Sequence, residues 1–254
     1  MRNEDALIAE FDKGIAPVAA LGVVVLQKDE TLEPELRSAL SDDGVALYHS
    51  RIPSDDEITP DTLQAMAAEI PRALRLLPVA RPLDVVAYAC TSASTMIGQA
   101  KIAAMIQEAH PTAAATDPIT AVIAACRHLG VQRLGLLTPY TLDVSAAMQA
   151  LLENAGLTIT AFASFEQSSD PLVARISPDS VHRGIRQVGR DTGVDAVFAS
   201  CTNLRTFEIL DAAEADIGKP IISSNAALAW HMREKAGLGP RTHAPGHLLK
   251  GSAA

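Results

Sequence analysis

Two stretches of the chain, DVVAYACTS at residues 84–92 and DAVFASCTN at residues 195–203, align without a gap. The offset is 111 residues, and the alignment places Cys90 on Cys201. Each stretch begins as a nearly continuous apolar run, which is typical of a strand buried on both faces of a parallel sheet. Near the same offset LGVVVL (21–26) falls on LGLLTP, with Gly22 against Gly135. The chain is therefore expected to contain two copies of one structural unit.

Short apolar runs alternate with Ala-rich helical patterns along the chain, which indicates the α/β class. Strands are predicted at 21–26, 44–50, 84–90, 133–138, 157–165, 195–201 and 220–224. Helices are predicted at 60–76, 94–109, 117–129, 142–155, 178–191, 204–214 and 225–236, and the tail after Pro240 is expected to be extended or frayed. We expect two similar doubly wound (flavodoxin-like) parallel-sheet halves related by a pseudo-two-fold axis. Residues 1–116 plus 225–254 would form the first half and 117–224 the second, with the active site in the cleft between them.

Composition narrows the class of protein. The 254 residues are 48% apolar, which is enough for a sizeable core, and 21 Lys and Arg against 30 Asp and Glu give a net charge of −9. So acidic a surface disfavours nucleic-acid binding. No apolar run approaches a membrane span, and residues 1–14 show no secretory signal. Three cysteines cannot form a disulfide framework, so we expect a cytoplasmic protein with reduced thiols.

The two aligned cysteines are the candidate catalytic residues. Each ends a predicted buried strand and is followed by a threonine, at the edge of the sheet where α/β proteins bind ligands. A helix starting there would stabilise a thiolate and hold an anion, although a helix dipole alone lowers a thiol pKa by less than about one unit. Neighbouring hydroxyls, contact with the substrate or exclusion of water would have to lower the thiol pKa further. Cys126, in the middle of a predicted helix, is interpreted as a core residue.

Several other kinds of site lack support in the sequence. The seven histidines form no metal-binding motif, and no phosphate-binding glycine loop is present, so neither a metal nor a cofactor is predicted. Ser92 and Ser94 lack the surroundings of a hydrolase nucleophile and are interpreted as helix N-cap and anion-contact hydroxyls. Arg51 fits either a contact to a substrate carboxylate or a surface ion pair.

The segments ACTSAS and SCTNL, each closing a strand of the repeat, resemble the aspartate/glutamate racemase superfamily. LGVVVLQKDETLEPEL, RLGLLTPYTLDV, DPLVARISP and KPIISSNAALAW are most similar to its maleate cis–trans isomerase, arylmalonate decarboxylase and ectoine-utilisation protein A branch. Maleate isomerases of this branch have Asn where this chain has Asp29 and Asp170, and a carboxylate there would repel a dicarboxylate. The decarboxylases have Gly at the position of Cys90. The resemblance therefore leaves the substrate open and disfavours decarboxylation.

The resemblance implies a cofactor-independent isomerase or racemase of a small carboxylate, acting as a homo-oligomer. Cys90 and Cys201 would act either as a pair of acid–base catalysts or as nucleophile and proton donor. The residues implied to contact substrate are Thr91, Ser92, Tyr140, Thr202, Asn203, Asp29 and Asp170. Two alternatives stay open: an arylmalonate-type decarboxylase, and a non-catalytic carboxylate-binding protein that uses the same cleft.

Overall fold

The computed structural model describes residue 7 and residues 9–251, and within them the strands form two separate four-stranded parallel sheets. The first sheet contains β1 (Ala19–Leu26), β2 (Val45–Ile52), β3 (Val85–Ala89) and β4 (Ala114–Thr116). The second contains β5 (Arg133–Tyr140), β6 (Thr158–Gln167), β7 (Ala196–Ala199) and β8 (Ile221–Ser223). The prediction of an α/β fold with two similar halves is confirmed.

Both sheets have the same strand order, β2-β1-β3-β4 and β6-β5-β7-β8. All eight residues of β1 and all five of β3 are buried, as their continuous apolar sequences predict for central strands. Gly22 and Gly135 occupy equivalent places, since each pairs with the central strand beside it, at Val86 and Val197. In both halves the chain reverses its direction of winding between the two central strands. Doubly wound sheets bind ligands outside the carboxyl ends of the strands at that point.

Helices cover both sheets. The first half contains α1 (Leu32–Leu40), α2 (Pro60–Ala65), the 3₁₀ turn η1 (Met66–Ala68), α3 (Ile70–Leu74), α4 (Thr91–Ile97) and α5 (Gln99–Ala109). These are followed by α6 (Pro118–His128), α7 (Leu142–Asn154), α8 (Asp170–Val173), α9 (Pro178–Gly189), α10 (Leu210–Ile217), α11 (Ser224–Ala236) and α12 (His247–Lys250). Gly98, whose φ is +92°, divides the predicted helix 94–109 into α4 and α5.

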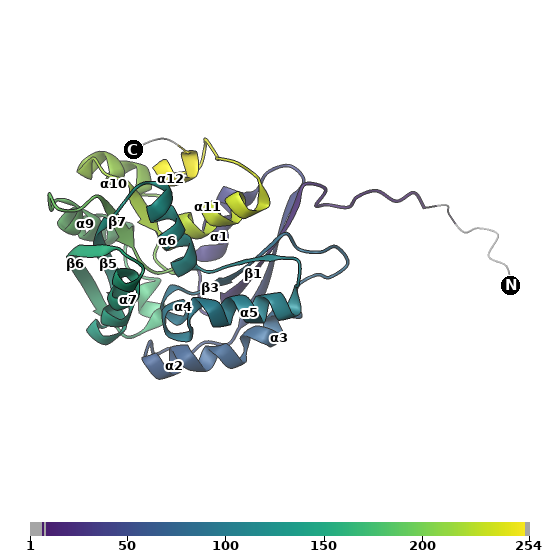
Figure 1. Cartoon of the computed structure of the whole chain (residues 1–254), viewed down its shortest axis with the longest axis horizontal. Coiled ribbons are helices and arrows are strands. Elements are labelled where there is room, and N and C mark those ends of the chain that lie inside the picture. The colour runs from purple at the N-terminus through teal and green to yellow at the C-terminus, as the bar shows by residue number, and fades with distance from the viewer. Residues whose placement is uncertain (1–6, 8, 252–254) are drawn as a thin grey trace.

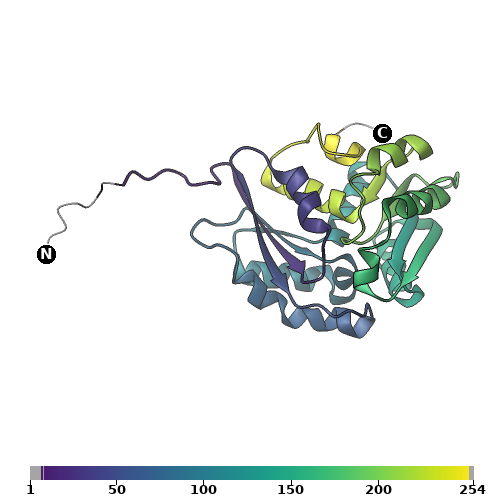
Figure 2. The same cartoon turned by 180° about the vertical axis from the view of Figure 1, so that it is seen from behind.

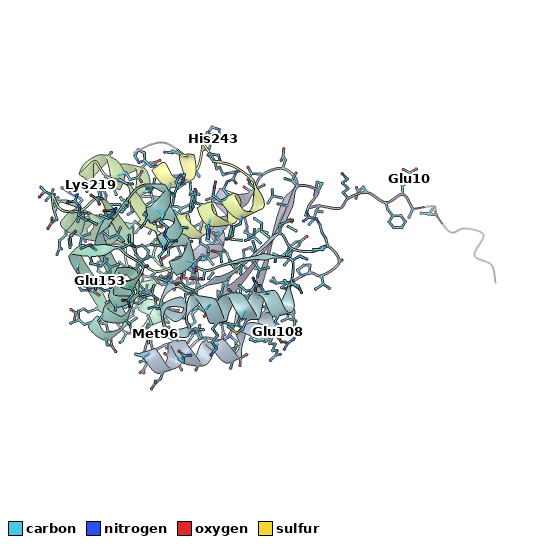
Figure 3. The ribbon with its side chains drawn as sticks, in the orientation of Figure 1. Glu10, Met96, Glu108, Glu153, Lys219 and His243 are labelled. Carbon is cyan, nitrogen blue, oxygen red and sulfur yellow. The ribbon has the colours of Figure 1, made fainter. Side chains whose placement is uncertain are left out.

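The two sheets lie side by side, the first on the right and the second on the left of Figure 1. Helix α11 packs on α1, β3 and β4 of the first half as well as on β8, and it also packs on α6. The division into 1–116 plus 225–254 and 117–224 stays a prediction. Figure 2 shows the segment before β1 projecting from the body, and Figure 3 labels Glu10 on it. The interpretation of residues 1–14 lies partly outside the described residues, in which no helix is long and apolar enough to cross a membrane.

Two elements were not predicted, and the expectation for the C-terminal tail is wrong. The sequence analysis missed α1, whose Pro34 and clustered acids resemble a loop although Pro is accepted in a first helical turn. It also missed the short strand β4. The tail after Pro240 is packed rather than frayed, because Leu248 and Leu249 of α12 are buried and Glu214 accepts the His247 N–H at 3.0 Å.

Candidate active site

A small closed pocket lies where the carboxyl ends of β1, β3, β5 and β7 meet. Its lining residues come from both halves: Leu26, Asp29, Asp55, Glu57, Ile58, Leu63, Met66, Cys90, Ser92, Tyr140, Asp170, Cys201, Thr202 and Asn203. The free volume is about 20 Å³, which is room for about one water molecule. Of the residues predicted to act on substrate, all except Thr91 line this one pocket. The pocket must therefore expand before it can accept a carboxylate.

Cys90 directly follows β3 and is itself the N-cap of α4. The Ala93 N–H donates to its Sγ at 3.4 Å, and the Ser92 hydroxyl lies 3.7 Å from the same sulfur. The expectation that Ser92 or Ser94 caps this helix is therefore wrong, since the helix begins at Thr91. Burial raises the pKa of Cys90 to about 12, against the opposing effect of these two contacts. The thiol is thus neutral near pH 7 in this closed pocket.

Cys201 occupies the equivalent place after β7, in a strained backbone conformation. Its φ is +129°, a region that residues other than glycine adopt rarely. The Asn203 N–H donates to the sulfur at 3.3 Å. The predicted helix 204–214 is wrong at its start: turns follow Cys201 and α10 begins only at Leu210. Burial raises the pKa of the Cys201 thiol well above its usual range, so exclusion of water opposes thiolate formation at both cysteines.

Tyr140, at the end of β5, places its phenol beside both sulfurs. Negative charge on either cysteine raises the pKa of this fully buried hydroxyl, after burial itself, and the hydroxyl in turn lowers the pKa of Cys201. The Tyr140 oxygen nevertheless has no hydrogen bond of ordinary length among the described residues. A buried phenol whose contact with the Cys201 sulfur falls short of a full hydrogen bond can donate to a substrate oxygen or to a thiolate formed during reaction.

Ser224 and Asn225, at the start of α11, tie the two cysteine loops together, and the sequence analysis missed both. The buried Ser224 hydroxyl accepts the Cys201 N–H at 3.0 Å and the Thr91 hydroxyl at 2.8 Å. The Asn225 side chain donates to the Thr202 carbonyl at 2.8 Å and to Glu35 at 2.7 Å. Thr91 therefore contacts Ser224 and is not part of the pocket lining. The only sequence signal for Ser224 was its place at the end of the predicted strand 220–224.

Glu35 of α1 holds the turn after Cys201 from the opposite half. Its carboxylate accepts the N–H groups of Thr206 and Phe207 at 2.7 and 2.9 Å, in addition to Asn225. Burial raises the pKa of Glu35 to about 7 even though these donors favour the charged form. The two halves are thus joined next to the second cysteine by a carboxylate that titrates near neutral pH.

Two buried carboxylates complete the pocket wall. Asp29 Oδ1 accepts the N–H groups of Thr31 and Leu32 at 2.9 and 2.8 Å and so caps α1. Asp170 Oδ1 accepts the side-chain amide of Asn203 at 3.3 Å. Burial raises the pKa of Asp29, and it raises that of Asp170 to about 6. The Asn203 amide oxygen also accepts the Glu30 N–H at 3.0 Å, so protein partners already hold that side chain.

A covering segment, residues 53–59, closes the pocket. Asp55, Glu57 and Ile58 of this segment line the cavity. The Ile58 N–H donates to the Ser168 carbonyl at 2.8 Å, and the Asp170 N–H donates to the Asp56 carbonyl at 2.9 Å. The segment therefore links β2 of the first half to α8 of the second. The closed cavity is smaller than any carboxylate substrate, and this segment is the part of its wall that connects the two halves.

Two residues weighed in the sequence lie outside the pocket lining. Cys126 is buried in α6, as predicted for a core residue. Arg51 pairs with Glu33 at 2.7 Å, and its Nη1 donates to the backbone carbonyls of residues 26, 27 and 29. Arg51 therefore shapes the loop after β1, and the ion pair is the correct alternative. Over the described residues, no group of three or more His, Cys, Asp or Glu side chains is placed to hold a metal ion.

Comparison with known proteins adds four findings. The family model of arylmalonate decarboxylase matches residues 53–249. The maleate isomerase of Alcaligenes faecalis is 24% identical over 245 residues, which are 91% of this chain and 96% of that protein. A structure of the Nocardia farcinica maleate cis–trans isomerase, a C→S mutant with a covalently bound succinylcysteine intermediate, is 24% identical, covers 92% of this chain and 99% of its own, and superposes with a TM-score of 0.83. For a structure of arylmalonate decarboxylase the identity is 23%, the coverage 92% and 100%, and the TM-score 0.72.

Proposed function

The chain belongs to the arylmalonate decarboxylase family, the branch that its motifs indicate, and from that premise we propose that it is a cofactor-independent isomerase of a small carboxylate. One observation carries this proposal: Cys90 and Cys201, at equivalent strand ends of the two halves, line the same closed pocket. A protein that only binds a carboxylate needs no pair of thiols. The maleate isomerase relatives match over more than nine-tenths of the chain, but so does the arylmalonate decarboxylase structure, so coverage favours neither reaction. Cys90, at the position where the decarboxylases are expected to have Gly, supports isomerisation over decarboxylation.

The first chemical requirement is a thiolate. Both thiols are neutral in the closed pocket because burial raises their pKa values. Displacement of the covering segment admits water and substrate and so removes the largest opposing effect. The Ala93 and Asn203 N–H groups, which already point at the two sulfurs, would then stabilise the thiolates.

Two reaction routes fit this arrangement. In a covalent route the Cys90 thiolate adds to one alkene carbon, the alkene π electrons move onto the adjacent carboxylate as an enediolate, and the new carbon–carbon single bond rotates. Return of those electrons expels the thiolate and leaves the trans alkene. In a two-base route one thiolate removes an α-proton, and the opposite thiol donates a proton to the other face. Tyr140 and the hydroxyls of Ser92 and Thr202 would stabilise the enediolate charge in either case.

The test compares three matched variants, Cys90→Ala, Cys201→Ala and Cys126→Ala. Wild type and each variant are incubated in deuterated water with cis-alkene, 2-amino, 2-hydroxy and malonate-type acids, and the products are followed by proton NMR and mass spectrometry. The covalent route predicts that Cys90→Ala loses all activity and that a mass adduct appears on Cys90 of the wild type. The two-base route predicts that each single variant loses interconversion while at least one still exchanges the α-proton. Cys126→Ala should keep activity in both cases.

Two results would contradict the proposal. If Cys90→Ala still releases carbon dioxide from a malonate-type acid at the wild-type rate, the chain is a decarboxylase. If no acid turns over but several bind equally well to wild type and to the Cys90→Ala and Cys201→Ala variants, it is a carboxylate-binding protein.

The substrate, the location, the oligomeric state and the partners of the protein remain expectations from its sequence. Maleate isomerisation and a reaction of the ectoine-utilisation group are the two candidate assignments for the substrate. The cytoplasmic location, the homo-oligomeric state and the lack of a nucleic-acid partner stay predictions from sequence. Substrate-contact roles for Ser92, Thr202 and Asn203 are part of the proposal.

A further inference from the structure

The charges lining the pocket are all negative, which is unusual for a site that must accept a carboxylate. Four carboxylates line it, and no Lys, Arg or His is among the lining residues of the described chain. Two of the four are buried, Asp29 at 3% and Asp170 at 8% exposure. A dicarboxylate would add two more negative charges next to these groups, and like charges held in a low-dielectric pocket repel strongly.

The nearest cations are engaged elsewhere. Lys28 pairs with Asp56 of the covering segment. Arg51 pairs with Glu33 and donates to three backbone carbonyls. Arg175 forms a bidentate ion pair with Glu30, with N–O distances of 2.8 and 2.9 Å. Lys28 and Arg51 act on Asp170 and Asp29 only at a distance, and neither lines the pocket.

One buried carboxylate oxygen of Asp29 faces the pocket without a well-formed hydrogen bond. The Oδ2 atom of Asp29 is buried and has no hydrogen bond of ordinary geometry in the described part of the chain; the Thr202 hydroxyl is near enough to Asp29 to favour the ionised form. Its other oxygen is already used in capping α1. Buried polar atoms are almost always hydrogen-bonded, so an unpartnered carboxylate oxygen in a ligand pocket indicates a donor on the ligand.

Asp170 lies close enough to Asp29 that each raises the energy of the other's charge. Its one side-chain hydrogen bond, from Asn203, is long at 3.3 Å. A single positively charged nitrogen between two such carboxylates would neutralise their repulsion and satisfy the free oxygen. The unpartnered Tyr140 phenol remains as a donor for a carboxylate of the same ligand.

We propose that this pocket takes a monocarboxylate that also carries a cationic nitrogen, and that Asp29 and Asp170 form the subsite for that nitrogen. The proposal rests on the proposed function, because it names the substrate class of the same pocket. Such a ligand matches both kinds of unsatisfied group, the acceptor of Asp29 and the donor of Tyr140. Its positive charge would also favour thiolate formation at the neighbouring cysteines.

The test measures binding without turnover, by isothermal titration calorimetry at pH 8, where Asp170 is ionised. The probes are 3-aminopropanoate, succinate and propanoate, which share a short chain and a carboxylate and differ at the far end. Wild type should bind 3-aminopropanoate at least tenfold more tightly than succinate or propanoate. Asp29→Asn and Asp170→Asn should each weaken 3-aminopropanoate binding at least tenfold and strengthen succinate binding. Asp61→Asn, which removes an exposed carboxylate of α2 outside the pocket, is the matched control and should change neither.

Several results would overturn the proposal. Wild type that binds succinate as tightly as 3-aminopropanoate contradicts it whether or not the variants fold. Succinate binding that strengthens below pH 6, without any preference for the amine, would show that protonated Asp29 or Asp170 donates to a second carboxylate. The groups facing these acids are Arg51, Thr202, Lys28 and Asp56. If the protein isomerises none of the acids but still prefers 3-aminopropanoate, the proposed function is contradicted and the proposed subsite is not.

Discussion

Replacing Ser224 with alanine should lower kcat as well as the stability of the fold. The Ser224 hydroxyl accepts the buried Cys201 N–H at 3.0 Å and the Thr91 hydroxyl at 2.8 Å. The Thr91 hydroxyl can rotate toward another acceptor, but the backbone N–H cannot. Leaving such a donor buried without a partner costs about 1–3 kcal/mol. The free energy of unfolding should therefore fall by roughly that amount.

The effect on kcat follows from the backbone of Cys201. A non-glycine residue with φ of +129° costs on the order of 1–3 kcal/mol and persists only where its surroundings hold it. Without the Ser224 acceptor the peptide can relax and move the sulfur away from its Asn203 donor. If the lost 1–3 kcal/mol appears in the transition state, kcat falls by about 5- to 150-fold.

Ser223→Ala is the matched control for this prediction. The Ser223 hydroxyl caps α11 by accepting the Ala226 N–H at 3.1 Å, so its loss should also cost about 1 kcal/mol of stability. Urea unfolding followed by circular dichroism gives both stabilities, and NMR turnover gives both kcat values. We expect kcat of Ser223→Ala within twofold of wild type. Equal kcat for the two variants, at similar stabilities, would refute the reasoning.

Three further predictions concern the cysteines, the link between the halves and a helix junction. Alkylation of Cys90 in the ligand-free protein should accelerate nearly tenfold per pH unit from 7 to 9, because its pKa is about 12; a plateau near pH 7 would contradict the buried neutral thiol. The contribution of Glu35 to stability should fall between pH 4.5 and about 7, since its raised pKa lets the folded state retain a proton that the unfolded state releases, and Glu35→Gln should lose this slope in urea titrations at several pH values. Gly98→Ala should cost about 1–3 kcal/mol of unfolding free energy, because φ is +92° there, while kcat stays unchanged; a stability equal to wild type would show that the junction relaxes freely.

The sequence was sufficient for the architecture and for most of the pocket. Buried strands can be recognised in the sequence as apolar runs. The carboxyl ends of parallel strands lie at the same edge of a sheet. Because Cys90 and Cys201 occupy equivalent strand ends of the repeat, the sequence was enough to place them together. The contacts that hold them could not be predicted. Ser224 lies 133 residues from Thr91, and Glu35 lies 171 residues from Thr206. No local pattern specifies such pairs, because they exist only once the two halves have docked.

Local sequence could not predict whether the pKa of each thiol is raised or lowered. A strand end leading into a helix suggests a stabilised thiolate, but at Cys201 no helix follows directly, and around Cys90 burial outweighs the N-cap contact. Burial raises both pKa values, and it depends on segments far away in the sequence that close the pocket together.

The raised pKa values of the two thiols affect how the pocket works. Thiolates, not thiols, react with alkenes, alkylating agents and oxidants, so two neutral thiols in a closed pocket are protected from reactions other than the intended one. The same closure makes the resting pocket inactive, because neither cysteine can act as base or nucleophile while protonated. Under the proposed function, activation would accompany substrate binding, through movement of residues 53–59 and through the charge that the substrate brings. A cationic nitrogen at Asp29 and Asp170 supplies that charge, whereas a dianion opposes it. Substrate selection and thiol activation would thus depend on the same two carboxylates.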